Sequence, residues 1–306
     1  SRLPGDAATG TMRHNLSRKV AAIMATLTRR FLSFAHQGGG LLAPENTLAA
    51  FDLGASYAPD ALELDIQMTR DGEIVVIHDP TVDRVTEGHG PVASYTLAEL
   101  QRLDAGYLFT PDGGQSYPFR GQGVRIPTLL EVFERFPNLL INIDLKETQE
   151  GKETALWRVI QQAQATHRVI VASFVCASLR RFRQLSGDVT LTSACPGEVA
   201  AFLLRQRLRA TRGMRPAYQA FQVPEVRSGV RVVSPAFVRA AHGLGVAVHV
   251  WTINTRAEME RLLDWGVDGI MSDRPDLLAE VLAQRGMTDQ TASSPAPGTT
   301  GNEDQL

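Results

Sequence analysis

Short runs of branched and aromatic residues alternate along the chain with longer stretches whose apolar residues recur at helical spacing. The short runs predict nine strands, at residues 32–36, 61–69, 73–79, 139–146, 169–174, 189–194, 220–224, 247–253 and 269–273. Helices are expected to begin near Pro44, Thr128, Glu153, Ala177, Pro196, Ser234, Thr255 and Pro275. A strand followed by a helix, repeated about eight times, is typical of an α/β fold with a parallel sheet.

The link at residues 70–72 between the second and third runs sets the topology. It is too short for the crossover that a parallel pair needs, and its Asp-Gly step favours a hairpin turn. Residues 73–79 should therefore fold back antiparallel, with His78 close to Leu64. The remaining eight strands predict a (β/α)8 TIM barrel, with its site at the C-terminal strand ends.

The alternation of strands and helices predicts a barrel preceded and followed by further segments. We expect the barrel at residues 31–286, a lead-in segment or helix at 1–30, and a disordered tail at 287–306. Residues of about 80–126 break the rhythm and are rich in glycine and aromatic side chains. We expect them to form an ordered cap over the barrel mouth.

Composition limits the classes of partner. The net charge of −2 gives no argument for nucleic acid, and no apolar run approaches the ~20 residues of a membrane span. Residues 18–34 are basic at both ends, which favours a helix packed on the barrel, with a helix on the membrane surface as the alternative. We expect a cytoplasmic location, with peripheral membrane contact if the alternative holds. The pattern does not determine the oligomeric state.

The two cysteines, Cys176 and Cys195, lack the spacing of metal ligands and are too few for a disulfide scaffold. We expect two reduced thiols in the core. A bridge between them stays open, since both lie near the ends of successive strands.

Three carboxylates are expected to meet at the strand ends. Glu63 and Asp65 lie two apart on one strand and therefore share a face. On the next barrel strand Asp144 and Lys146 are spaced in the same way. Three oxygen ligands favour one divalent ion, Mg²⁺ or Ca²⁺, over zinc. The structural alternative, strand-end acids balanced by basic residues, does not account for the histidines beside them.

Two histidines flank these acids in the sequence. His36 ends the first strand and His78 lies near the end of the hairpin strand. A histidine can act as base in one step and as acid in the next near neutral pH. Lys146 can stabilise developing negative charge on a phosphate. Three carboxylates, one lysine and a divalent ion sum to zero, so the site can accept a phosphodiester.

The chain resembles the glycerophosphodiester phosphodiesterases over residues 34–284. The motifs that carry the resemblance are AHQGG with PENT, LELDIQMTRDGEIVVIHD with TVDRVT, GVRIPTLLEVFERFP, INIDLKE, ASF, HVWTINT and GVDGIMSDRPD. The resemblance implies a barrel enzyme that releases an alcohol and sn-glycerol 3-phosphate. It implies that the acid/base pair is His36 and His78, that the metal ligands are Glu63, Asp65 and Asp144, and that the groups near substrate are Gln37, Lys146, Phe174 and Trp251. Asn254 and Asp273 fall in its motifs as supporting residues.

Two positions depart from the family pattern. Gln37 stands where the family usually has arginine, so a charged, bidentate phosphate donor is replaced by a neutral amide. Asp144 stands where the family usually has glutamate, which shortens the reach to the metal. Arg70 and Arg84 are candidates to compensate for Gln37.

The leading hypothesis is metal-dependent hydrolysis of glycerophosphodiesters. A lysophospholipase D-like activity is the first alternative, with an acyl chain against the aromatic cap. The second is a non-catalytic barrel that binds phosphate ligands, a reading that only Gln37 favours.

Overall fold

The computed structural model describes residues 30–146 and 149–287. The predicted lead-in segment and tail therefore lie outside the described residues, apart from Arg30 and Met287. Within the described ranges no helix is long and apolar enough to cross a membrane.

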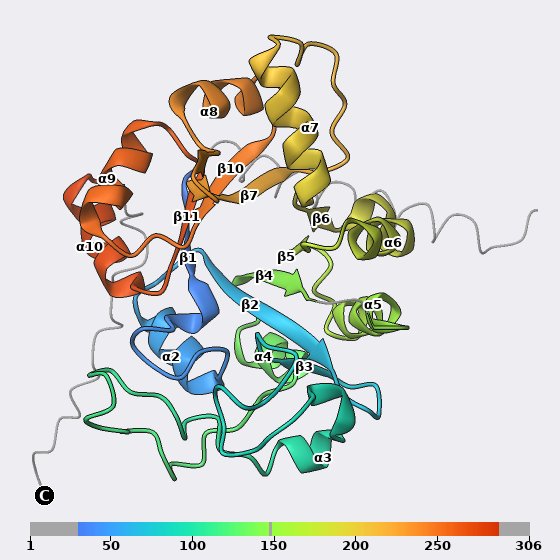
Figure 1. Cartoon of the computed structure of the whole chain (residues 1–306), viewed down its shortest axis with the longest axis vertical. Helices are drawn as coiled ribbons and strands as arrows, with labels where there is room; N and C mark the ends of the chain where they lie inside the picture. Colours follow the sequence, from blue (N-terminus) through green and yellow to red (C-terminus); the bar gives the residue numbers. More distant parts are fainter. Residues whose placement is uncertain (1–29, 147–148, 288–306) are drawn as a thin grey trace, which may run out of the picture.

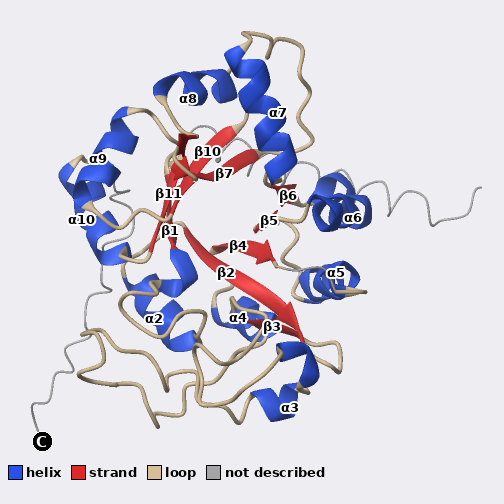
Figure 2. Cartoon of the chain, viewed as in Figure 1, coloured by secondary structure: helices blue, strands red, loops and turns tan. Residues whose placement is uncertain are grey.

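Eight parallel strands of the described chain form a barrel, with helices around its outside (Figures 1 and 2). The strands are β1 (Leu32–Ala35), β2 (Ala61–Met68), β4 (Leu140–Leu145), β5 (Val169–Ala172), β6 (Leu191–Thr192), β7 (Ala220–Pro224), β10 (Ala247–Trp251) and β11 (Gly269–Ser272). Their order is β6-β5-β4-β2-β1-β11-β10-β7, and a parallel bridge between Ser193 and Ala220 joins the two ends. The predicted (β/α)8 barrel is confirmed.

The ninth predicted strand, β3 (Ile74–Val76), pairs antiparallel with β2. Ile66 lies opposite Val76, and the Ile77 amide donates to the Asp65 carbonyl at 3.0 Å. Continued by two residues, this register sets His78 opposite Leu64. The hairpin turn thus brings His78 back to the carboxylate strand, as the Asp-Gly step predicted.

Helices on the outside bury the other face of the strands. They are α2 (Leu48–Ser56), α4 (Leu129–Arg135), α5 (Lys152–Gln162), α6 (Cys176–Ser186), α7 (Pro196–Arg207), α8 (Pro235–His242), α9 (Arg256–Asp264) and α10 (Pro275–Gln284). Thr47, Thr128, Ser234 and Thr255 cap four of them by accepting a backbone N–H. Helix α2 begins at Leu48, after this cap, and not at Pro44 as expected.

The segment at 80–126 does not cover the barrel mouth, which corrects the expected cap. Its short helix α3 (Leu97–Leu100) and its loops lie beside β3 and α4 (Figure 1). Val82, Val92 and Leu100 are buried there against Val75 of β3. The segment is therefore held by apolar burial on the side of the barrel, and it contributes no residue to the wall of the cavity described below.

A second hairpin, β8 (Val226–Arg227) with β9 (Val230–Arg231), follows β7 and was not predicted. Its turn residues Ser228 and Gly229 both have positive φ, at 49° and 77°, as a two-residue type I′ turn requires. Two residues per strand are too few to give a periodic signal in the sequence, which explains why it was missed.

Cys176 and Cys195 form a disulfide bond, so the expectation of two reduced thiols was wrong. Cys176 is the first residue of α6 and Cys195 immediately precedes α7. Both follow neighbouring parallel strands, whose C-terminal ends meet at the same edge of the barrel. Disulfides are rare in most reducing compartments, and the cytoplasmic location stays a prediction.

Candidate active site

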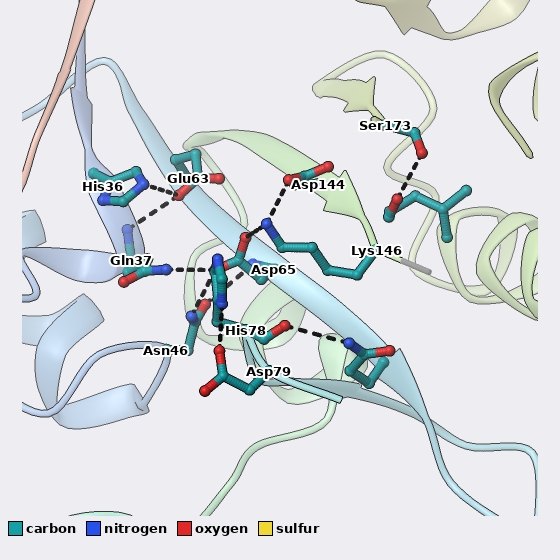
Figure 3. Close-up of polar contacts among 12 residues, drawn as sticks. His36, Gln37, Asn46, Glu63, Asp65, His78, Asp79, Asp144, Lys146 and Ser173 are labelled. Atoms are coloured by element: carbon teal, nitrogen blue, oxygen red, sulfur yellow. Dashed lines mark hydrogen bonds and ion pairs between the residues drawn. The ribbon is translucent and has the colours of Figure 1, made fainter. Parts of the chain in front are cut away.

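The barrel brings the three predicted carboxylates together at its C-terminal end (Figure 3). Glu63 and Asp65 project from β2, and Asp65 lies directly beside Asp144 of β4 in the parallel register. Their exposed fractions are 4%, 1% and 7%. Three acids this close and this buried need positive charge or protons nearby.

Lys146 supplies part of that charge. Its Nζ lies 2.8 Å from Asp65 Oδ1 and 2.6 Å from Asp144 Oδ2. Burial alone would raise the pKa of Asp65, but Lys146 and the two histidines outweigh it and lower the value. The pKa of Lys146 is raised by the two aspartates despite its burial.

Glu63 lies farther from the lysine and is less well neutralised. Burial raises the pKa of its carboxyl group, the Asp65 charge adds to the rise, and His36 only partly opposes it. The pKa of Asp144 is raised as well, mainly by burial, and its buried Oδ1 atom has no hydrogen-bond partner among the described residues. The raised pKa values show that Lys146 does not fully compensate for the burial and mutual repulsion of the three carboxyl groups.

His36 connects β1 to the carboxylates. Its Nδ1 lies 2.6 Å from Asp273 Oδ1, and its Nε2 lies 3.7 Å from Glu63 Oε2. Burial lowers the pKa of the imidazole, but Glu63 and Asp273 outweigh this and raise it to about 9. Asn254 donates to the other Asp273 oxygen at 2.8 Å. Asp273 and Asn254 thus fix the His36 ring with Nε2 toward the acids.

His78 has a carboxylate partner of its own. Its Nδ1 lies 2.6 Å from Asp79 Oδ1, which leaves Nε2 for the cavity that His78 lines. Arg84 bonds both to Asp79, at 2.6 Å, and to Glu45, at 2.7 Å. These contacts orient His78. They also engage the Arg84 guanidinium group, so Arg84 does not compensate for Gln37.

Arg70 is also committed elsewhere, to Glu99 at 3.1 Å and to the Ser94 carbonyl at 2.8 Å. Gln37 itself adopts a left-handed φ of 52° and is buried. Its Nε2 donates to Asp65 Oδ2 at 2.6 Å, and its side chain does not line the cavity. As placed, Gln37 supports a carboxylate, and its predicted contact with phosphate stays a prediction.

Asn46 is a site residue that the sequence did not single out. Its Nδ2 donates to Asp65 Oδ2 at 2.9 Å, and its Oδ1 accepts from the Asp65 amide at 3.1 Å. It belongs to the PENT motif, and Asp79 follows His78 directly. Both positions lay within recognised motifs, but only the fold shows what they contact.

The carboxylates fit a hard divalent cation in kind. Glu63, Asp65 and Asp144 offer oxygen ligands, and the unpartnered Asp144 Oδ1 leaves one of them without a donor. Their arrangement, however, is not that of a complete metal site. Among the described residues no three His, Cys, Asp or Glu side chains are placed to hold a metal ion, and Lys146 Nζ lies within 2.8 Å of both aspartates.

A cavity of about 590 Å³ opens beside these residues. One side carries His36, the three acids, His78 and Lys146. The opposite side is largely apolar and comes from α7, the β8–β9 hairpin and neighbouring strands; it includes Ala194, Pro196, Val199, Ala200, Leu203, Val223, Val230 and Val232. Phe174 and Trp251 both line the cavity, with ring centroids 5.7 Å apart.

Comparison with known proteins agrees with this geometry. Residues 36–277 match the sequence model of the glycerophosphoryl diester phosphodiesterase family. A glycerophosphodiester phosphodiesterase of Caldanaerobacter subterraneus subsp. tengcongensis is 36% identical, with 83% of this chain and 99% of the relative covered.

Solved structures show the same fold. A glycerophosphoryl diester phosphodiesterase domain of Mycobacterium tuberculosis superimposes with a TM-score of 0.72 at 23% identity, covering 83% of this chain and 99% of the domain. A phosphodiesterase of Oleispira antarctica, solved with the product sn-glycerol-3-phosphate, superimposes with a TM-score of 0.66 at 25% identity, covering 82% and 96%.

Together, the barrel, its site and these relatives define a phosphoric diester hydrolase. The chain belongs to the glycerophosphoryl diester phosphodiesterase family, whose sequence model spans most of its length.

Proposed function

We propose that this enzyme hydrolyses glycerophosphodiesters to an alcohol and sn-glycerol 3-phosphate, with His36 and His78 as the acid/base pair. One observation carries the proposal. Each histidine has its Nδ1 on a carboxylate, Asp273 or Asp79, which directs Nε2 of the two rings toward the cavity and its acids. A histidine oriented in this way can transfer a proton at a defined atom.

The raised pKa of His36 suits it to be the acid of the first step, because it holds its proton at neutral pH. His78 then removes the proton from the attacking hydroxyl while His36 protonates the departing alcohol. If the glycerol 2-hydroxyl attacks, a cyclic phosphate forms and water opens it in a second step with the roles reversed. A substrate lacking the 2-hydroxyl tests this route, since full turnover of it would require direct attack by water.

We also propose that Glu63, Asp65 and Asp144 hold one divalent ion, Mg²⁺ or Ca²⁺. When bound, such an ion polarises a phosphate oxygen and lowers the pKa of a nearby hydroxyl group. The support is the mutual repulsion of the three buried carboxyl groups, which a divalent ion would relieve, and the Asp144 Oδ1 atom, which has no hydrogen-bond partner among the described residues. Binding requires Lys146 to give up part of its contact with the aspartates.

The test is release of glycerol 3-phosphate from several glycerophosphodiesters, with Mg²⁺ or Ca²⁺ added or removed by chelator. We expect turnover that is lost with chelator and returns with metal. Binding of the metal alone, followed by calorimetry, should weaken in the Asp144→Asn variant. Turnover unaffected by chelator would refute the metal proposal but not the hydrolysis. Ligand binding without turnover of any diester would favour the non-catalytic alternative.

The pH profile should depend on Asp273. Its negative charge helps to raise the pKa of His36, so Asp273→Asn should lower that pKa. Activity that needs protonated His36 would then be lost at lower pH, and the alkaline limb of kcat/KM should move toward acid. Asp276→Asn is the control, because Asp276 pairs with Arg274 and not with a histidine. If the alkaline limb does not move in Asp273→Asn, that limb reports the titration of a group other than His36.

The apolar side of the cavity supports a lysophospholipid as a second candidate substrate. An acyl chain would lie against α7 and the β8–β9 hairpin, and not against the segment at 80–126 as first expected. Leu203 lines the cavity, whereas its neighbour Leu204 is 60% exposed and does not. Leu203→Arg should therefore lower kcat/KM for a lysophospholipid at least ~10-fold, since burying a few methylenes contributes about 0.8 kcal/mol each.

The controls use the same helix and a second substrate. Leu204→Arg should leave turnover of lysophospholipid unchanged, and Leu203→Arg should leave turnover of a small diester nearly unchanged. Equal losses on both substrates would show that Leu203 supports the fold and not an acyl chain.

A further inference from the structure

Arg227 is a cation of the cavity that forms no ion pair with any described residue. Lys146 and Arg227 are the lysine and arginine side chains that line it. Lys146 is held between two aspartates, whereas Arg227 makes no hydrogen bond or ion pair with any residue in the described ranges. Its guanidinium group lies over the aromatic ring of Phe174, whose centroid is 5.4 Å from the guanidinium carbon.

The hairpin that carries Arg227 is anchored at its base. Glu225, directly before β8, is nearly buried and pairs with Arg231 and Arg261, both at 2.6 Å. The two-residue turn sets Arg227 opposite Val230, and both side chains line the cavity. The fold therefore holds this arginine at the rim of the cavity.

Phe174 lies near both Lys146 and Arg227. Lys146 Nζ lies 6.0 Å from its ring centroid, close to the distance for Arg227, so one bound molecule can touch both. An exposed aromatic face attracts a quaternary ammonium group. Here a guanidinium already lies over that ring, and its charge repels a second cation and attracts an anion.

We propose that Arg227 binds a negative charge on the alcohol portion of the substrate. This rests on the proposed hydrolysis of glycerophosphodiesters and specifies its substrate class. The preferred diesters carry a second anionic group, a phosphate or a carboxylate, beyond the scissile phosphate. Diesters of a quaternary ammonium alcohol are disfavoured. Arg227 is thus a specificity-determining residue, placed apart from the groups that transfer protons.

The experiment compares kcat/KM for three substrates: bis(glycerophospho)glycerol, whose leaving alcohol is anionic; glycerophosphoglycerol, whose leaving alcohol is neutral; and glycerophosphocholine. In Arg227→Glu we expect a loss of about 10-fold or more on the first, little change on the second and a gain on the third. Added salt should shrink these differences, because the contact is exposed to solvent. Arg212→Glu is the control, since Arg212 is exposed, does not line the cavity and changes the net charge equally.

Two outcomes overturn the proposal. Equal loss on all three substrates would place Arg227 on the scissile phosphate, and no loss on any would leave it as a surface charge. Binding of the same three molecules to His36→Asn, measured by calorimetry, separates the proposal from the proposed hydrolysis. If the wild type turns over none of the three, the proposed hydrolysis is refuted. The proposal for Arg227 then holds only if the anionic molecule binds most tightly and Arg227→Glu abolishes that preference.

Discussion

Replacing His36 by asparagine is expected to lower kcat/KM for a glycerophosphodiester by about 10²–10⁴-fold. The asparagine amide can still donate to Asp273, as the imidazole Nδ1 does at 2.6 Å, but it has no group that exchanges a proton near neutral pH. The packing around the site should therefore persist while proton transfer is lost. His78→Asn should cause a loss of the same order, because Asp79 orients the second proton-transfer group in the same way.

The matched control for both variants is His89→Asn. His89 also faces an aspartate, Asp83, at 3.3 Å, but its side chain is 85% exposed and it lies outside the cavity. It should retain full activity, and all three variants should keep the melting temperature of the wild type within a few degrees. Near-normal turnover by both His36→Asn and His78→Asn would refute the acid/base assignment.

Replacing Lys146 by methionine should give the largest loss of stability among the site variants. It leaves Asp65 and Asp144 side by side and buried, without the ammonium group that now lies within 2.8 Å of both. Removing one partner of a buried ion pair typically costs about 3–5 kcal/mol of unfolding free energy. Activity should fall as well, because a positive charge beside the scissile phosphate is lost.

The loss of stability should depend on pH. Without Lys146 the folded-state pKa of Asp144, which burial already raises, should rise further, and that of Asp65 should rise because its largest opposing charge is lost. A carboxyl group whose pKa is raised on folding stabilises the protein below its unfolded-state pKa. This stabilisation is lost as the pH rises through its folded-state pKa. The difference between wild type and Lys146→Met should therefore be small in acid and large at neutral pH.

Denaturant unfolding across this pH range measures the effect. Arg135→Met is the control, because Arg135 pairs with Asp52 on the surface and such pairs contribute about 0–1 kcal/mol. Divalent metal should restore part of the stability of Lys146→Met if the carboxylates bind it. A loss that is the same at every pH would mean that Lys146 acts through packing and not through its charge.

Local sequence rules accounted for most of the barrel. Short runs of branched and aromatic residues located all nine predicted strands, and Thr128, Ser234 and Thr255 were predicted helix starts that cap their helices. The Asp-Gly turn fixed the register of β3 and so the position of His78. These features depend on neighbours within a few residues, which is why the sequence revealed them.

Other features escaped because they depend on contacts between distant segments. The segment at 80–126 has the composition of a cap, yet its apolar residues are buried on the side of the barrel. The cysteines carried no spacing signal, since their pairing depends on two strand ends meeting in space. Arg84 was a candidate for the phosphate until the structure showed it bound to Asp79 and Glu45.

The sequence by itself determined the fold class, the family and the identity of the acids and histidines, because spacing on a strand decides which side chains share a face. Only the tertiary structure decided how those groups are charged and held. Gln37 lies against Asp65, Lys146 lies between two aspartates, and Arg227 lies over Phe174 at the rim. Electrostatic interactions act through space between segments far apart in the chain, so their balance appears only once the barrel has closed.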